Sequence, residues 1–198
     1  MAADAIDLIT EDHRLLETLF ARLTEDDVDR LALVAEITAR LTAHARAEEQ
    51  EVYPAIKKAA AAEADEVDHA YDEHLEAEHE LRKVRNLIGS PHFAEAVEAF
   101  VAAVTHHVQE EESDVLPALR EAVDAATLRR LGEAFADVRA GLLTEAGFAP
   151  PPDAVNGDGN DLTEATRDEL YEMAKKADVA GRSSMTKEEL AEALRHQP

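Results

Sequence analysis

Two stretches of the chain place a histidine and a glutamate four residues apart on what is otherwise the apolar side of a helix. They read HARAEEQEVYPAI from His44 and HVQEEESDVLPAL from His107, and they agree at the His, at the Glu four and five residues on, and at the later Pro-Ala pair. Residues i and i+4 stack on one helix face, so each imidazole and its glutamate can reach the same ion. Any fold of this chain must bring both faces into its interior.

Each of these pairs follows a single histidine in an earlier helical segment. His13 precedes His44 by 31 residues, and His74 precedes His107 by 33. The spacing indicates an internal duplication of a helix pair, in which each copy contributes a lone His and then a His-x-x-x-Glu.

The apolar residues of the N-terminal part recur at steps of three and four, which predicts helices. The second of these helices is expected to begin near Asp29, and Gly89, Ser90 and Pro91 are expected to stop the third. A fifth helix is predicted from Leu128 to Leu142. Only 7 Gly, 7 Pro and 4% aromatic residues fit long helices better than sheets. The predicted fold class is all-α, an up-and-down antiparallel bundle of four helices with an added fifth.

The histidines and glutamates of the repeat continue the apolar stripes of their helices. Val34, Ile37 and Leu41 lead to His44 and Glu48, and Val97, Phe100 and Val104 lead to His107 and Glu111. His13 lies between Ile9 and Leu16, and His74 lies between Tyr71 and Leu81. Burying so many ionisable groups costs several kcal/mol each unless they are paired or coordinated.

A single stripe histidine is more often satisfied by a carbonyl or a carboxylate, but six duplicated inward positions favour a metal. The expected ligands are His13, His44, Glu48, His74, His107 and Glu111. Six ligands exceed the needs of one tetrahedral zinc, so two ions bridged by Glu48 and Glu111 fit better. Imidazole and carboxylate do not by themselves choose iron over manganese or zinc.

The other five histidines do not lie on these stripes and are interpreted as surface residues. They are His69, His79, His92, His106 and His196.

Four motifs, taken in order, resemble the hemerythrin-like HHE cation-binding domain. They are EDHRLLETLF around His13, HARAEEQEVYP around His44, AYDEHLEAEHEL around His74 and HHVQEEESDVLP around His107. The resemblance covers about residues 5 to 123. It implies a four-helix bundle holding a non-haem di-iron centre, oxo- or hydroxo-bridged, with the same four His as nitrogen ligands and Glu48 and Glu111 as carboxylate bridges.

One position departs from the oxygen-carrying hemerythrins, which have a second His one turn after the third-helix His. Here that position is Glu78, a candidate extra oxygen ligand, and Glu17 stands in the same relation to His13. An oxygen-rich ligand shell favours the ferric state and argues against reversible oxygen transport. For both residues the alternative is a solvated carboxylate at the rim.

The sequence APPPDAVNGDGND predicts a break after the bundle. The expected organisation is a di-metal helical bundle over residues 1–148, a flexible linker over 149–160 and a small helix–loop–helix module over 161–198. The module has two capping boxes, Thr166 to Glu169 and Thr186 to Glu189. It resembles SAP domains and the N-terminal domain of the Rho termination factor, which implies nucleic-acid binding, but its acids outnumber its bases. A protein contact is the alternative.

Composition narrows the possible functions. No cysteine is present, which excludes disulfides, thiolate metal sites and a catalytic thiol, and 44 acidic against 20 basic residues make nucleic acid and anionic membranes improbable partners. Neither a secretory leader nor a membrane span is expected, so the expected location is cytoplasmic.

Three functions remain open at this point. The first is a di-iron protein that binds, senses or buffers dioxygen, nitric oxide or redox state, for example in an oxidative-stress response. The second is an enzyme that decomposes hydrogen peroxide, and the third is an interaction protein with a structural metal. The absence of a substrate-pocket signature favours a small diatomic ligand or peroxide.

Overall fold

The computed structural model describes residues 3–151 and, in the tail, residues 167, 171, 185–187, 189 and 190. The chain divides into two compact units, residues 1–155 and 156–198. The predicted linker at 149–160 spans the division, and the domain bounds stay a prediction. In the tail, the Thr186 to Glu189 capping box is present, because each backbone N–H meets the other residue's side-chain oxygen, at 2.8 and 3.2 Å. The box predicted at Thr166 and the rest of the module lie outside the described residues.

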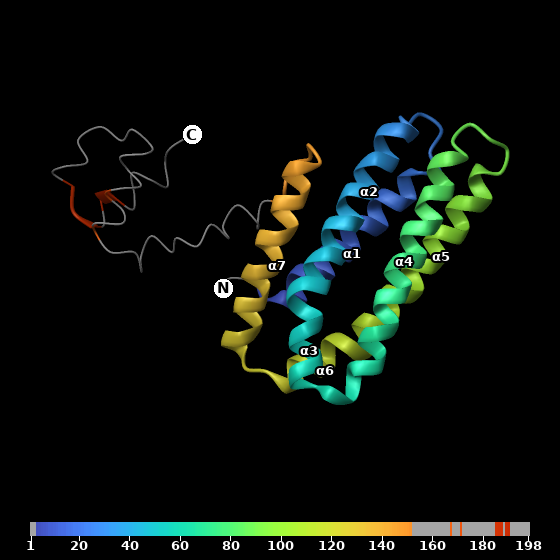
Figure 1. The fold of residues 1–198 in the computed structure, drawn as a ribbon. Helices are drawn as coiled ribbons and strands as arrows, with labels where there is room; N and C mark the ends of the chain where they lie inside the picture. Colours follow the sequence, from blue (N-terminus) through green and yellow to red (C-terminus); the bar gives the residue numbers. More distant parts are fainter. Residues whose placement is uncertain (1–2, 152–166, 168–170, 172–184, 188, 191–198) are drawn as a thin grey trace. The chain divides into compact units, whose positions relative to one another are not determined.

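All regular elements within the described residues are helical, as predicted (Figure 1). The five long helices are α1 (Ala5–Arg22), α2 (Arg30–Ala47), α4 (Ala64–Asn86), α5 (Phe93–Glu110) and α7 (Ala125–Glu145). The shorter elements are the π-helical turn η1 (Glu48–Val52), α3 (Tyr53–Ala59), the 3₁₀ turn η2 (Ala61–Glu63), the π-helical turn η3 (Glu111–Val115) and α6 (Leu116–Ala122).

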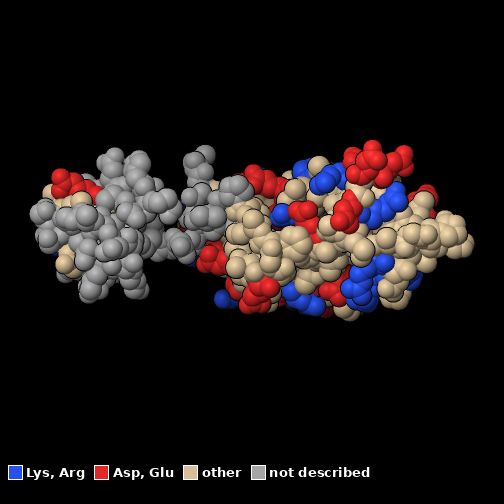
Figure 2. Space-filling model, turned by 90° about the horizontal axis from the view of Figure 1, so that it is seen from above, with Lys and Arg blue, Asp and Glu red and all other residues tan. Residues whose placement is uncertain are grey.

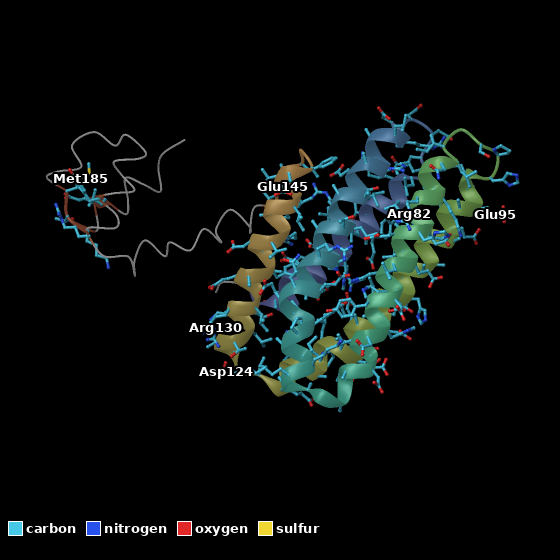
Figure 3. All side chains as sticks on the ribbon, viewed as in Figure 1. Arg82, Glu95, Asp124, Arg130, Glu145 and Met185 are labelled. Carbon is cyan, nitrogen blue, oxygen red and sulfur yellow. The ribbon has the colours of Figure 1, made fainter. Side chains whose placement is uncertain are left out.

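The predicted helix boundaries agree closely with the structure. Asp29 is the N-cap of α2 and accepts a hydrogen bond from the Ala32 N–H at 3.1 Å. Asp124 caps α7 in the same way through Thr127, at the helix end labelled in Figure 3. Helix α4 ends at Asn86, and Gly89 follows with a φ of 82°, a conformation that favours glycine.

Helices α1, α2, α4 and α5 form the bundle, and the fifth helix, α7, packs against α1 and α2 (Figure 1). The α7 contact is close at Gly132. A Cβ there would lie 2.8 Å from the Ala5 nitrogen and 2.9 Å from the Asp4 carbonyl carbon. Glycine therefore lets α7 approach the start of α1.

Two apolar clusters fill the bundle, and the six predicted ligands lie between them along every helix. In α1, Leu8 and Ile9 belong to one cluster and Leu16 and Leu19 to the other, with His13 between them. The same order recurs around His74 in α4, where Val67 and Ala70 precede it and Ala77 and Leu81 follow. A polar layer thus crosses an otherwise apolar core.

The helices carrying the His-Glu pairs change geometry at the glutamates. The sequence predicts a bend at Pro54 and Pro117, about two turns past the ligands, but the distortion begins at Glu48 and Glu111 themselves. There the Tyr53 N–H bonds to the Glu48 carbonyl, and the Leu116 N–H bonds to that of Glu111. The proline that follows lacks an N–H and crowds the preceding turn, which widens to i→i+5 bonding upstream of it.

Charged side chains of both signs share the surface of the bundle. On the face shown in Figure 2, the Lys and Arg residues lie scattered among Asp and Glu. None of the helices in the described part of the chain is long and apolar enough to cross a membrane.

Candidate metal centre

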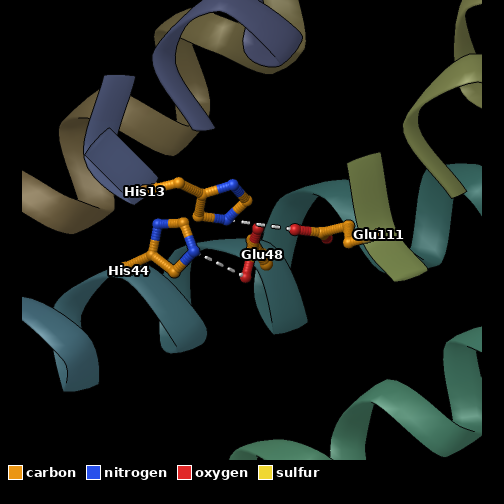
Figure 4. Close-up of side chains that lie close together, drawn as sticks. All are labelled: His13, His44, Glu48 and Glu111. Carbon is orange, nitrogen blue, oxygen red and sulfur yellow. Dashed lines mark ion pairs between the residues drawn. The ribbon is translucent and has the colours of Figure 1, made fainter. Parts of the chain in front are cut away.

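Two imidazoles and two carboxylates converge from both copies of the repeat (Figure 4). They belong to His13, His44, Glu48 and Glu111, and one ligand atom from each lies within 4.8 Å of all the others. His13 Nε2 is 3.3 Å from Glu111 Oε2, and His44 Nε2 is 3.3 Å from Glu48 Oε2. The first two helices and both π-helical turns therefore meet at one point.

A second group lies beside the first and consists of Glu48, His74 and His107. His74 Nε2 is 3.4 Å from Glu48 Oε2 and 3.1 Å from His107 Nε2. Glu48 belongs to both groups, as expected of a bridging carboxylate. Glu111 belongs only to the first, although its Oε1 accepts a hydrogen bond from the Tyr53 hydroxyl on the other side, at 3.2 Å.

The six predicted ligand residues are all buried, which confirms their inward orientation. Their exposed fractions are 5% or less. Several of their polar atoms meet no hydrogen-bond partner, namely His13 Nε2, both oxygens of Glu48 and Glu111 Oε2. Burying polar atoms without hydrogen-bond partners costs free energy, because they lose their contacts with water. A cation bound between these converging nitrogen and oxygen atoms would offset that cost. The residues present therefore fit a pair of metal ions.

Each of the four histidines points its Nδ1 at a carboxylate outside the centre. The pairs are His13 with Glu112 at 2.8 Å, His44 with Asp12 at 3.3 Å, His74 with Glu49 at 3.1 Å and His107 with Glu73 at 3.0 Å. An ionised carboxylate can only accept, so each Nδ1 carries a proton and Nε2 is the nitrogen that faces the centre. All four imidazoles are thus held in the orientation that a metal requires.

The outer carboxylates follow the duplication. The acid before the lone His, Asp12 or Glu73, pairs with the second His of its own copy. The acid after the glutamate, Glu49 or Glu112, pairs with the lone His of the other copy. The two copies therefore lock each other's histidines in place across the bundle.

Two residues break this symmetry. Arg139 of α7 is 2% exposed and donates to Asp12 Oδ1 at 2.5 Å. Tyr53 lies beside the second group, its hydroxyl 3.4 Å from His74 Nε2, while the equivalent position of the other copy is Leu116. Tyr53 follows Glu48 by five residues, which would leave them about 140° apart on an α-helix, and the wider π-helical turn brings them closer to the same face.

The buried charges shift the ionisation of the centre. Burial lowers the pKa of His44 to about 4, so this imidazole is neutral at pH 7. Burial opposes the charge on His13 too, but the neighbouring Glu111 carboxylate, 3.3 Å away, and the charge of Glu48 outweigh it and raise the His13 pKa to about 9. Burial and the neighbouring Glu111 raise the pKa of Glu48 well above its usual range. Without a metal, the centre therefore retains protons.

The remaining sequence-predicted residues lie apart from the two groups. Glu78 is a quarter exposed and pairs with Arg46 and Arg82, each at 3.5 Å. Glu17 is half exposed and pairs with Arg14 at 2.8 Å. The expected surface histidines are exposed where the structure describes them, and they are His69, His79, His92 and His106. His196 lies outside the described residues.

A small cavity adjoins the centre on the side of the apolar cluster that contains Leu16 and Leu41. Its volume is about 10 Å³, and the four histidines of the centre line it together with aliphatic side chains such as Leu16, Leu41 and Val104 and with Glu78. Glu78 is thus the predicted extra ligand that borders the centre without joining either group. The space suits one molecule of about the size of water. Only a very small ligand fits there without movement of the bundle.

Sequence reasoning missed the outer carboxylates, Arg139 and Tyr53. The repeat did carry a signal for the carboxylates, because an acid precedes both lone histidines and a second glutamate follows both predicted bridges. A run of glutamates is, however, typical of a solvated helix face, so the second glutamates do not stand out in the sequence. Arg139 and Tyr53 belong to only one copy or to α7, so no repeat marks them.

Comparison with known proteins supports the fold and identifies a family. The model of the Hemerythrin HHE cation-binding domain family matches residues 4–119. The fold is similar to the crystal structure of a hemerythrin HHE cation-binding domain-containing protein from Mycobacterium kansasii, with a TM-score of 0.64 and 25% identity over 78% of this chain and 99% of that one. A DNA nickase from Nostoc sp. (strain PCC 7120) is 32% identical over 117 residues, which are 58% of this chain and 33% of the nickase. The chain thus spans about a third of that relative.

Proposed function

This chain belongs to the hemerythrin HHE cation-binding domain family, and we propose that it holds two iron ions and binds a small redox-active ligand at them. The observation that carries the proposal is the pair of overlapping groups sharing Glu48, with all four Nε2 atoms facing inward. Neutral imidazole and carboxylate suit iron, although they accept manganese and zinc as well. The choice of iron rests on the family resemblance.

The protein itself would orient the metal-binding histidines and exclude bulk water from the centre. The outer carboxylates hold the histidines by Nδ1, and the small volume and the aliphatic side chains of the cavity keep bulk water from it. A redox metal there supplies an open coordination position for dioxygen, nitric oxide or peroxide. Larger substrates are excluded by the size of the cavity. We therefore favour sensing or buffering of such a ligand.

Tyr53 favours a second candidate, the decomposition of hydrogen peroxide. Its hydroxyl lies 3.2 Å from Glu111 and 3.4 Å from His74 Nε2, within reach of a ligand at the second group. Burial and the Glu111 charge raise the Tyr53 pKa, so the hydroxyl keeps its proton at neutral pH. A held proton beside the metals is what cleavage of an O–O bond uses.

The test is metal content together with absorption spectra of protein expressed with ample iron. We expect about two iron ions per chain and a visible spectrum that changes on adding oxygen, nitric oxide or peroxide to the reduced protein. Rapid oxygen release from peroxide would select the second candidate. One zinc per chain, or a spectrum indifferent to all three ligands, would overturn the proposal. His92→Ala, an exposed histidine, is the matched control for His107→Ala, which should lose metal.

A further inference from the structure

An acidic cavity lies between α4 and α5 and reaches the candidate metal centre from outside. Its volume is about 390 Å³, and its carboxylates are those of Glu63, Glu66, Glu73, Glu110, Glu111 and Asp114. His107 also lines it, and the lining includes no Lys or Arg. Concentrated negative charge in a concave site raises the local concentration of cations.

Two of the carboxylates that line this cavity form a third group of possible metal ligands with a neighbouring histidine. One ligand atom from each of His69, Glu73 and Glu110 lies within 4.8 Å of the other two. His69 Nε2 is 3.7 Å from Glu73 and 3.8 Å from Glu110, which approach it from different helices. His106 adds a second imidazole 3.6 Å from the other oxygen of Glu110.

The outer group is connected to the buried centre by shared residues. Glu73 uses one oxygen toward His69 and the other to accept the Nδ1–H of His107 at 3.0 Å. Beyond it, the cavity is lined by Glu111, which is 1% exposed and whose Oε2 belongs to the buried centre, 3.3 Å from His13 Nε2. The acidic cavity therefore extends from the outer group to a carboxylate of the centre, and its negative charge favours the presence of cations along that path.

We propose that His69, Glu73 and Glu110 form an outer site that captures a divalent cation and passes it through the acidic cavity to the buried centre. The proposal rests on the metal centre proposed above, and it gives that centre its route of loading and release. The outer site is partly exposed and has few fixed ligands, so its cation keeps several waters and binds weakly. Weak capture at the mouth of the cavity favours transfer over retention.

Mn²⁺ binding to the full, metal-loaded protein tests the outer site. Free Mn²⁺ counted by electron paramagnetic resonance should reveal one additional Mn²⁺ per chain beyond the inner metals. His69→Ala with Glu110→Gln should weaken that binding at least tenfold while the inner metal content stays unchanged. The matched control is His92→Ala with Glu95→Gln. It alters another exposed His–Glu pair, 3.5 Å apart, whose Glu95 lies on the outer side of α5 (Figure 3).

Transfer is tested by the rate at which excess chelator removes the inner metals. We expect removal to be several-fold slower in the His69, Glu110 double variant than in the parent and the control. Equal Mn²⁺ binding by all three proteins, or equal removal rates, would overturn the proposal. Failure of the proposed function would appear differently, as missing inner metal in the parent protein.

Discussion

The buried pair of Arg139 and Asp12 ties the fifth helix to the metal centre, and replacing the arginine should destabilise the protein. Their side chains are 2% and 10% exposed, and the Nη1–Oδ1 distance is 2.5 Å. At an effective dielectric constant of about 20, two charges this close attract by ~7 kcal/mol. Much of that offsets the cost of removing both from water, and deleting one partner of such a pair typically costs about 3–5 kcal/mol.

We therefore expect Arg139→Met to lower the free energy of unfolding by about 3 kcal/mol or more, a large part of the 5–15 kcal/mol typical of a domain. Asp12 would remain buried with only the His44 imidazole as a described partner. Because Asp12 orients His44, the variant should also bind metal about tenfold more weakly.

Urea unfolding followed by circular dichroism at equal metal content measures the effect. Arg130→Met is the matched control on the same helix, and as an exposed residue it should change stability by less than about 0.5 kcal/mol. Adding Asp12→Asn to Arg139→Met should cost less than the sum of the single changes by about 1 kcal/mol or more. Additive losses, or an Arg139→Met loss as small as that of the control, would refute the reasoning.

Four further outcomes are expected. Apparent metal affinity should rise with pH between about 6.5 and 9. The reason is the His13 pKa of about 9 in the metal-free site, because a proton must leave His13 before its Nε2 can bind a metal. A metal affinity that does not change with pH over this range would contradict the prediction. For the same reason His13 stabilises the metal-free fold most below pH 6.5, and this contribution should fade as pH approaches 9 in denaturant titrations. Tyr53→Phe should keep the metal content while slowing any peroxide decomposition at least tenfold in an oxygen-evolution assay, and an unchanged rate would remove the proton-donor role. A chain ending at Val155 should keep its helicity, metal content and spectrum, because the contact boundary falls there; metal loss on truncation would show that the tail belongs to the bundle.

Much of the fold and the inner residues of the centre follow from the sequence alone. Apolar residues at helical spacing predict long helices, and a histidine or glutamate that continues such a stripe must face the core. His44 and Glu48 can be assigned to the core in this way without knowledge of what lies opposite them. The same holds for the other four polar residues of the two groups, and all six are buried as predicted.

The sequence could not decide what surrounds those residues, because contacts across a bundle depend on packing. Glu78 continues its stripe as well as Glu48 does, yet it pairs with Arg46 and Arg82 and remains a quarter exposed. Glu49 looks like part of a solvated acidic run, yet it holds His74 of another helix. The sequence around Glu78 and Glu49 does not show which of the two glutamates contacts a histidine of the centre.

The tertiary structure also decided how the two copies differ. The duplication predicts equivalent halves, but α7 brings Arg139 to only one of them, 127 residues along the chain from its partner Asp12. The π-helical turn brings Tyr53 to the side of the centre, where its hydroxyl reaches Glu111, although α-helical spacing from Glu48 would have placed it on another face. Periodicity along one helix determines which residues face inward, whereas helix packing and a local change in helical pitch determine which side chains they meet.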